Sequence, residues 1–279
     1  MAAPPDSSPL ACPVRGCGRP LVRQPRAWSC ARGHSFDVAR RGYVNLLQPG
    51  DRRSRAAGDS PAALAARERL EARGLGEELR AALAAEALAL ALPPGARALD
   101  VGAGTGLLLA RLAGAARLEG WALDLSAAAA ERGARRHPEL AWVVANADRR
   151  LPFAAGAFAL LVSCTGPKHP REFRRVLALG GVLLLAVPGA DDLIELRAAL
   201  TGRGRPIERA AKTLSRFGAE FRGEGRQEIR ARANLDRAGI EDLLAASYRG
   251  ARHAERRRLG ALDALAVTLA TEILRLRAL

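Results

Sequence analysis

Between residues 97 and 187 the chain alternates short apolar runs with segments of helical composition, and this alternation limits the fold more than any other feature. The apolar runs are Arg97–Gly102, Arg117–Asp124, Leu140–Ala145, Phe158–Ser163 and Gly181–Val187. The helical segments lie near 106–113, 127–136, 170–178 and 191–200. Strands that are separated by helices pair in parallel through crossover connections. The pattern therefore predicts an α/β domain built on a parallel sheet.

Further elements are expected on both sides of this region. Ser60 can cap a helix that has Pro61 in its first turn and continues as an Ala/Leu/Glu/Arg run to about Leu92. Beyond it, the tail predicts a strand at Gln227–Ala233, a helix at Asp236–Ala246 and a second strand at Val267–Arg277. Five strands plus this terminal pair give a Rossmann-like, seven-stranded sheet, the arrangement of class I methyltransferases.

The first strand-to-helix turn reads Leu99-Asp-Val-Gly-Ala-Gly-Thr-Gly106. Three glycines let the backbone turn tightly and approach a bound nucleoside where a Cβ would collide. Asp100 suits a ligand that carries an ammonium group, and Asp124 ends the next strand, where a carboxylate can accept from both ribose hydroxyls. These features predict a site for S-adenosylmethionine. Its expected residues are Asp100, Gly102, Gly104, Thr105, Gly106, Asp124, Asn146 and Asp148.

Other interpretations of this site stay open. An NAD-dependent dehydrogenase is disfavoured because the Gly-x-Gly-x-x-Gly spacing and a Tyr-x3-Lys set are missing. Leu151-Pro-Phe before an apolar strand is instead typical of methyltransferases. Asp100 and Asp124 could be solvated strand ends, and Asn146 and Asp148, assigned here to the adenine edge, could be loop residues without a ligand.

Three of the four cysteines lie in the first thirty residues. The pattern is Cys12-x4-Cys17, then Cys30-x3-His34, which can fold into two knuckles around a tetrahedral Zn²⁺. Four protein ligands predict a structural site, which a module with few large apolar residues needs for stability. The alternative is a set of incidental thiols. The fourth cysteine, Cys164, is expected to be a small buried residue.

The formal net charge is +15, which indicates a polyanionic partner, nucleic acid before membrane. Residues 1–55 hold ten Arg and three Asp, and the stretch Arg249–Arg258 is also basic, so both are expected to contact phosphates. No secretory signal and no bilayer-spanning apolar run is visible, which predicts a cytoplasmic protein. We expect a zinc-binding RNA-contact module at 1–50, a linker and helical segment at 51–92, and a methyltransferase domain at 93–279.

The segment from Cys30 through Ser35-Phe-Asp-x-Ala-x-x-Gly-Tyr-Val-Asn-Leu-Leu47 is joined to Arg53-Ser-Arg55, Gly58-Asp-Ser60 and Ala-Arg-x-x-Leu at 66–70. With the two motifs above, it resembles bacterial 23S rRNA (guanine-N1) methyltransferases that carry an N-terminal zinc module. The resemblance covers Cys12 to about Leu200 well. It implies methylation of guanine N1 in a hairpin loop of domain II of 23S rRNA, and a homodimer is possible.

Some positions depart from this family. Gly74-Leu75-Gly76 stands where members have Gly-His-Tyr, and Asp191-Asp192 stands in place of an Arg-His pair. The aromatic patch near the C-terminal helix is reduced to Tyr248. A catalytically silent or retargeted zinc-knuckle RNA-binding protein therefore stays open as an alternative, as does a small-molecule methyltransferase. No proton acceptor for guanine N1 can be assigned: Asp191, Asp192 and His169 are candidates, each more simply explained as a loop residue.

Overall fold

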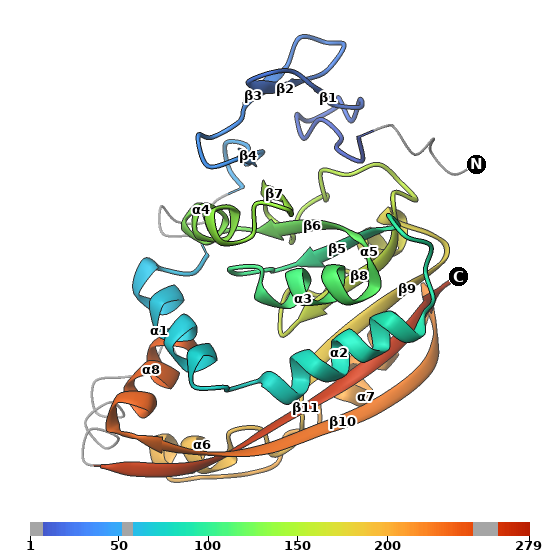
Figure 1. Cartoon of the computed structure of the whole chain (residues 1–279). Helices are drawn as coiled ribbons and strands as arrows, with labels where there is room; N and C mark the ends of the chain where they lie inside the picture. Colours follow the sequence, from blue (N-terminus) through green and yellow to red (C-terminus); the bar gives the residue numbers. More distant parts are fainter. Residues whose placement is uncertain (1–7, 52–57, 248–261) are drawn as a thin grey trace.

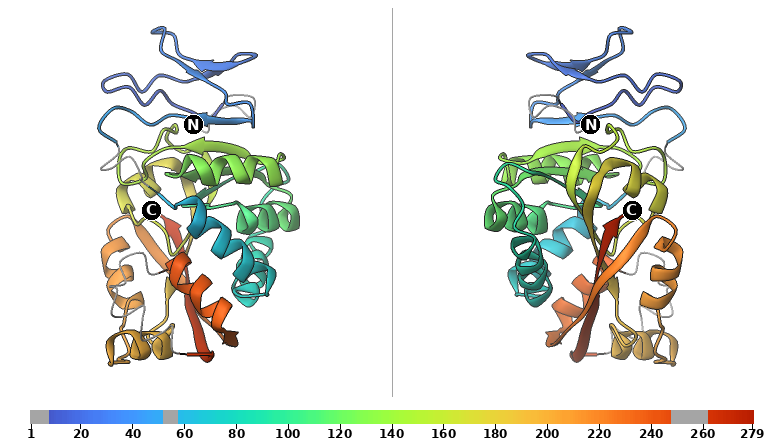
Figure 2. Two further views of the ribbon diagram at one scale, coloured as in Figure 1. Left: turned by 90° about the vertical axis from the view of Figure 1, so that its left-hand side faces the viewer. Right: turned by 90° about the vertical axis from the view of Figure 1, so that its right-hand side faces the viewer.

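The computed structural model describes residues 8–51, 58–247 and 262–279 (Figure 1). A small antiparallel sheet at the N-terminus lies against the edge of a large mixed sheet (Figures 1 and 2). The small sheet consists of β1 (Val22–Arg23), β2 (Ala27–Ser29) and β3 (Ser35–Asp37). The large sheet has eight strands in the order β10-β11-β9-β8-β5-β6-β7-β4.

Six strands of the large sheet pair in parallel, and β11 runs antiparallel to both of its neighbours, β9 and β10. The parallel strands are β4 (Tyr43–Asn45), β5 (Arg97–Val101), β6 (Glu119–Asp124), β7 (Ala141–Val144), β8 (Phe158–Cys164) and β9 (Leu177–Pro188). The others are β10 (Phe221–Asp236) and β11 (Ala264–Ala278). The chain reverses strand order between β5 and β8, so the carboxyl ends of these two strands form the crevice where α/β sheets bind ligands.

Helices cover both faces of this sheet (Figures 1 and 2). One face packs against α2 (Glu77–Ala89), α3 (Leu107–Ala116) and α4 (Ala127–Arg136). The other packs against α5 (Pro170–Val176) and α7 (Ala210–Phe217). A third apolar cluster joins α1 (Pro61–Ala72), α6 (Ile194–Thr201) and α8 (Arg237–Ser247) beside the terminal hairpin. None of the helices in the described ranges is long and apolar enough to cross a bilayer.

The structure confirms the predicted α/β fold, including the Ser60 cap, whose Oγ accepts from the N–H of Ala63 at 3.2 Å. Two expectations were wrong in detail. The sheet has eight strands and not seven, because β4 pairs in parallel with β7. The expected helical run from Ser60 to Leu92 is two helices, because Gly74 and Gly76 adopt φ of +85° and +76°, which a helix does not permit.

The N-terminal module does not stand apart from the large domain. Leu10, Leu21 and Leu46 are each 1% exposed and belong to the same apolar cluster as Phe153 of the large domain. A bridge between Leu10 and Phe153 and the pairing of β4 with β7 tie the module to the sheet edge. The module and the sheet therefore share one core.

Candidate active site and metal centre

The glycine-rich turn lies at the carboxyl end of β5 and leads into α3. Gly102, Gly104 and Gly106 have φ of +87°, +56° and +82°, a region that L side chains rarely adopt. A Cβ on Gly106 would lie 2.5 Å from Cη2 of Trp142, so this position excludes every side chain. Thr105 is buried inside the turn. At the three glycine positions the turn carries no side chain of its own, as close approach of a nucleoside to the backbone requires.

Asp124 holds the turn in place. Its carboxylate accepts from the N–H of Gly104 and from the N–H of Ser126, both at 2.8 Å. Burial raises the pKa of Asp124, while these two N–H groups and the Arg67 guanidinium oppose that effect. Arg67 lies over the same turn: its Nη1 is 2.9 Å from Asp59 and 3.5 Å from the place of a Cβ on Gly104.

Asp100 lies near the carboxyl end of β5 and is 2% exposed. Its Oδ1 has no hydrogen-bond partner among the described residues. Burial, with a smaller effect of the Asp124 charge, raises the pKa of Asp100 to about 7. An ammonium group would supply the missing partner and favour the charged carboxylate. The glycine cradle and this orphaned carboxylate both fit S-adenosylmethionine.

The residues expected at the adenine edge, Asn146 and Asp148, both lie in the loop after β7. Asn146 donates through Nδ2 to the carbonyl of Asp51 at 2.7 Å and accepts from the N–H of Asp148 at 2.9 Å. The Asn146 side chain therefore links the loop after β7 to Asp51, at the end of the zinc module, by a hydrogen bond. Asp148 is exposed.

A second pocket of about 270 Å³ adjoins the crevice beyond β8 and β9. Asp192 lines it and accepts from the N–H of Ala270 at 3.0 Å; burial raises its pKa. Asp191 instead pairs with Arg230, and His169 caps α5 through Nδ1. Of the three acceptors considered from sequence, only Asp192 therefore lines this pocket. Glu71 also lines this pocket. It could not be singled out from the sequence, because it lies within an uninterrupted helical run.

Cys12, Cys17, Cys30 and His34 converge, with all four ligand atoms within 4.8 Å of one another. Sγ of Cys17 and Cys30 are 3.9 Å apart, and Nδ1 of His34 is 3.4 Å from Sγ of both Cys12 and Cys30. Zinc–sulfur bonds of about 2.3 Å in a tetrahedron place neighbouring ligands about 3.8 Å apart. The donor set and its spacing fit a zinc ion. Cys164 lies at the end of β8, outside this cluster.

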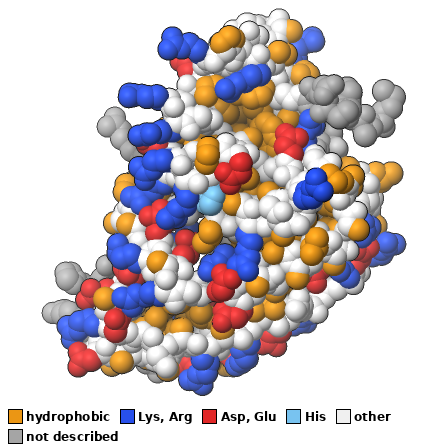
Figure 3. Space-filling view, viewed as in Figure 1, with side chains coloured by type: hydrophobic (Ala, Val, Ile, Leu, Met, Phe, Trp, Pro, Cys, Tyr) orange, Lys and Arg blue, Asp and Glu red, His pale blue; other side chains and the backbone are white. Residues whose placement is uncertain are grey.

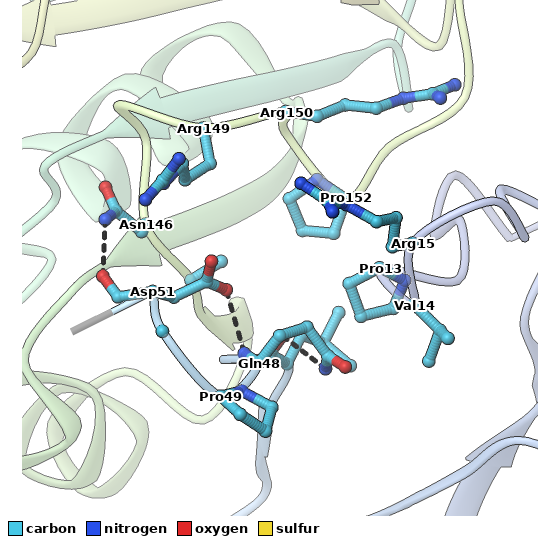
Figure 4. Close-up of a pocket in the computed structure, with 13 residues that line it drawn as sticks. Pro13, Val14, Arg15, Gln48, Pro49, Asp51, Asn146, Arg149, Arg150 and Pro152 are labelled. Atoms are coloured by element: carbon cyan, nitrogen blue, oxygen red, sulfur yellow. Dashed lines mark hydrogen bonds between the residues drawn. The ribbon is translucent and has the colours of Figure 1, made fainter.

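A cleft of about 750 Å³ separates the zinc module from the loop after β7 (Figure 4). Arg15 enters from the module, while Arg149 and Arg150 enter from the loop. No ion pair of these three arginines with another described residue is present, although Asp51 lies in the same cleft. Figure 3 shows Lys and Arg side chains along one edge of the molecule, from the module downward. Arg53, Arg55, Tyr248 and Arg249–Arg258, all predicted contributors, lie outside the described residues.

Comparison with known proteins agrees with this architecture. Residues 10–55 match the zinc-ribbon family described as RlmA, N-terminal, and residues 98–181 match the family described as methyltransferase domain. The chain is 36% identical to the 23S rRNA (guanine(748)-N(1))-methyltransferase of Streptomyces fradiae, over 85% of this chain and 83% of that protein. It belongs to the 23S rRNA (guanine-N1) methyltransferase family.

Two further relatives of this family span as much of the chain. A Micromonospora griseorubida protein named for the same activity is 39% identical, and YxjB of Bacillus subtilis is 31% identical, each over 86% of both chains. The solved structures that resemble this chain have low sequence identity, so the likeness to them shows only the shared fold. YcgJ of Bacillus subtilis has a TM-score of 0.51 at 15% identity, covering 70% of this chain and 97% of its own. A methyltransferase solved with the Haloferax volcanii activator Trm112 has a TM-score of 0.52 at 18% identity, covering 80% and 99%.

Proposed function

We propose that this member of the family transfers the methyl group of S-adenosylmethionine to N1 of a guanine in a hairpin loop of domain II of 23S rRNA. The observation that carries the proposal is the match to the Streptomyces fradiae enzyme, which runs through both the zinc module and the methyltransferase domain. Guanine 748 is the base in that relative's name. Dimerisation is not needed for the proposal.

The residues of the crevice have distinct roles in this proposal. S-adenosylmethionine supplies an electrophilic methyl group, and the protein orients it and excludes water. Asp100 pairs with the ammonium group, Asp124 accepts from the ribose hydroxyls, and the turn from Gly102 to Gly106 passes beneath the nucleoside. Asn146 and Asp148 are assigned to the adenine edge. The four residues Cys12, Cys17, Cys30 and His34 hold a structural zinc ion.

The cleft between the zinc module and the loop after β7 is the proposed path of the RNA backbone. Arg15, Arg149 and Arg150 face it from two sides. Arginine forks match phosphate oxygens, and each phosphate that is neutralised releases counterions. The cleft would thus position the RNA strand on the sheet edge next to the cofactor crevice, without reading its bases.

Replacing Arg15, Arg149 and Arg150 together by Ala is expected to weaken RNA binding and to flatten its salt dependence. The slope of log K against log salt should fall by about 2 to 3, since each lost phosphate contact removes about 0.7 to 0.9. Filter binding of a domain II transcript from 50 to 300 mM salt measures this change. The matched control removes three exposed charges elsewhere, at Arg203, Arg205 and Lys212. An equal change of slope in the control would contradict a specific cleft.

The affinity for S-adenosylmethionine is expected to depend on pH through Asp100. The pKa of Asp100 is raised to about 7 in the free protein, so below pH 7 binding must first release a proton. The affinity should fall about tenfold per pH unit below 7 and decline again above about 8, as the ligand's amino group loses its charge. Calorimetric titration measures this. Asp100→Asn should bind weakly at every pH, without the acidic limb.

The stability of the free protein depends on the ionisation of Asp100 in the opposite direction to the cofactor affinity. An acid whose pKa is raised on folding stabilises the folded state at low pH, and that stability is lost as the pH rises from about 4 towards 7. Stabilisation by the cofactor, read as the shift in melting temperature, should therefore be larger at pH 7.5 than at pH 5.5.

Transfer of labelled methyl from S-adenosylmethionine to unmodified 23S rRNA tests the proposed function. Primer extension on the product should stop in the domain II hairpin, because N1 methylation blocks base pairing. Binding of S-adenosylmethionine without transfer to any RNA would instead favour the catalytically silent RNA-binding protein, which the departures at Gly76 and Asp191 motivate.

A further inference from the structure

The pocket beside the cofactor crevice has the size and walls of a site for one base. Its volume of about 270 Å³ lies near the lower end of the range for ligand sites. Most of its walls are apolar side chains of α1, α2, α8 and the β10–β11 hairpin, among them Leu70, Leu79 and Leu243. Thr165, directly after β8, and Arg67 connect it to the glycine turn. A planar base in this pocket would lie beside the crevice proposed for the cofactor.

Glu71 is an acidic side chain of this pocket with a buried oxygen to which no described residue donates. Its Oε2 is buried and has no hydrogen-bond partner among the described residues. Asp192 differs, since its Oδ1 already accepts from the N–H of Ala270. Glu78 lines the pocket from α2 but is exposed to solvent. A buried carboxylate oxygen without a donor is costly, and a ligand N–H would remove that cost.

The charged groups around Glu71 leave it able to take a proton. Burial raises its pKa above the ordinary 4.5, while Arg80 of α2, Arg67 of its own helix and Arg136 of α4 lower it. Glu68 of α1 raises it further. From the loop after β9, Asp192 lines the same pocket. The raised pKa makes Glu71 a stronger base than an exposed Glu.

We infer that Glu71 binds the N1–H of the target guanine and accepts its proton during methyl transfer. The inference rests on the proposed function. As the bond from N1 to the methyl carbon forms with the N1 electron pair, the bond from that carbon to sulfur breaks and its electrons stay on sulfur. The N1 proton moves to a carboxylate oxygen of Glu71 and is later released to water. Guanine, not adenine, presents a hydrogen at N1, so the same contact selects the base.

Glu71→Gln tests this role, since Gln keeps the size of the side chain but cannot accept the proton. The single-turnover rate on 23S rRNA should fall by at least about 100-fold, within the usual range for a general base. Affinities for S-adenosylmethionine and RNA should stay within about threefold. The wild-type rate should rise with pH to a plateau, and this break should disappear in the variant. Glu131→Gln, an exposed acid on α4, is the control and should keep the wild-type rate.

Asp192→Asn separates the two acids of the pocket. A wild-type rate and pH profile in Glu71→Gln, with the loss found in Asp192→Asn, would overturn the inference. A loss of RNA binding that accounts for the whole effect of Glu71→Gln would also overturn it, since Glu71 would then be only a structural residue.

A readout that needs no turnover keeps this inference separate from the proposed function. The ¹³C carboxyl resonance of Glu71, assigned by its loss in Glu71→Gln, should shift when guanosine monophosphate is added with S-adenosylhomocysteine. Adenosine monophosphate should leave it unchanged. Suppose that the wild-type protein shows this guanine-specific shift but does not methylate rRNA. The proposed function would then be wrong, while the contact between Glu71 and guanine would stand. An unchanged resonance with both nucleotides would overturn the role of Glu71.

Discussion

Asp124→Ala is expected to lower the affinity for S-adenosylmethionine by at least about 100-fold, since hydrogen bonds to a charged group contribute about 1.5–3 kcal/mol each and two or more would be lost. The substitution removes the proposed acceptor of the ribose hydroxyls. It also frees the N–H groups of Gly104 and Ser126, which the carboxylate now holds at 2.8 Å. The cofactor site would then lose both a contact to the ligand and the hydrogen bonds that hold the glycine-rich turn.

Calorimetric titration of the purified protein measures this effect. Asp263→Ala, which removes an exposed Asp at the start of the terminal strand, is the control and should bind the cofactor as the wild type does. Zinc content should be one ion per chain in both variants, because the metal cluster lies on other elements. Wild-type affinity in Asp124→Ala would show that the cofactor lies elsewhere.

Cys30→Ala is expected to remove zinc and to destabilise the large domain as well. The binding energy of a structural zinc site is folding energy, so a module with three ligands should unfold. Leu10, Leu21 and Leu46 are buried in the core shared with Phe153. Exposing them would cost about 1.5–3 kcal/mol per side chain. The melting temperature should therefore fall for the whole protein and not only for the module.

Metal analysis and calorimetric melting measure this. Cys164→Ala, which removes the cysteine outside the cluster, should keep one zinc per chain. Removing zinc from the wild type with a chelator should give the same lowered melting temperature as Cys30→Ala. A variant without zinc that melts as the wild type does would contradict the shared core.

The parallel strands and the cofactor turn could be predicted from the sequence because their signals are local. Apolar runs of strand length at Arg97–Gly102 and Arg117–Asp124 indicated the strands. The three glycines of Gly102–Gly106 marked the turn, and the structure gives all three a positive φ. The metal cluster could be predicted for the same reason, because its four ligands form two pairs with short spacings, Cys12–Cys17 and Cys30–His34. In each case the residues that carry the signal are neighbours in the chain.

What could not be predicted depends on contacts between distant segments. Three residues of β4 do not make a recognisable strand, and β4 becomes one by pairing with β7, about a hundred residues later. The length of β10, 16 residues, likewise comes from its pairing with β11. Glu71 was indistinguishable from other acids of a helical run, because its burial is created by α2, α8 and the terminal hairpin.

The central claim is that this protein methylates N1 of a guanine in domain II of 23S rRNA. Its most direct test is nucleoside mass spectrometry of an unmodified domain II transcript after incubation with the protein and S-adenosylmethionine. We predict one 1-methylguanosine per transcript, located in a hairpin loop, and none with Asp124→Ala. Methylation of another base or another guanine atom, or no methylation by a protein that binds both the cofactor and the transcript, would contradict the account.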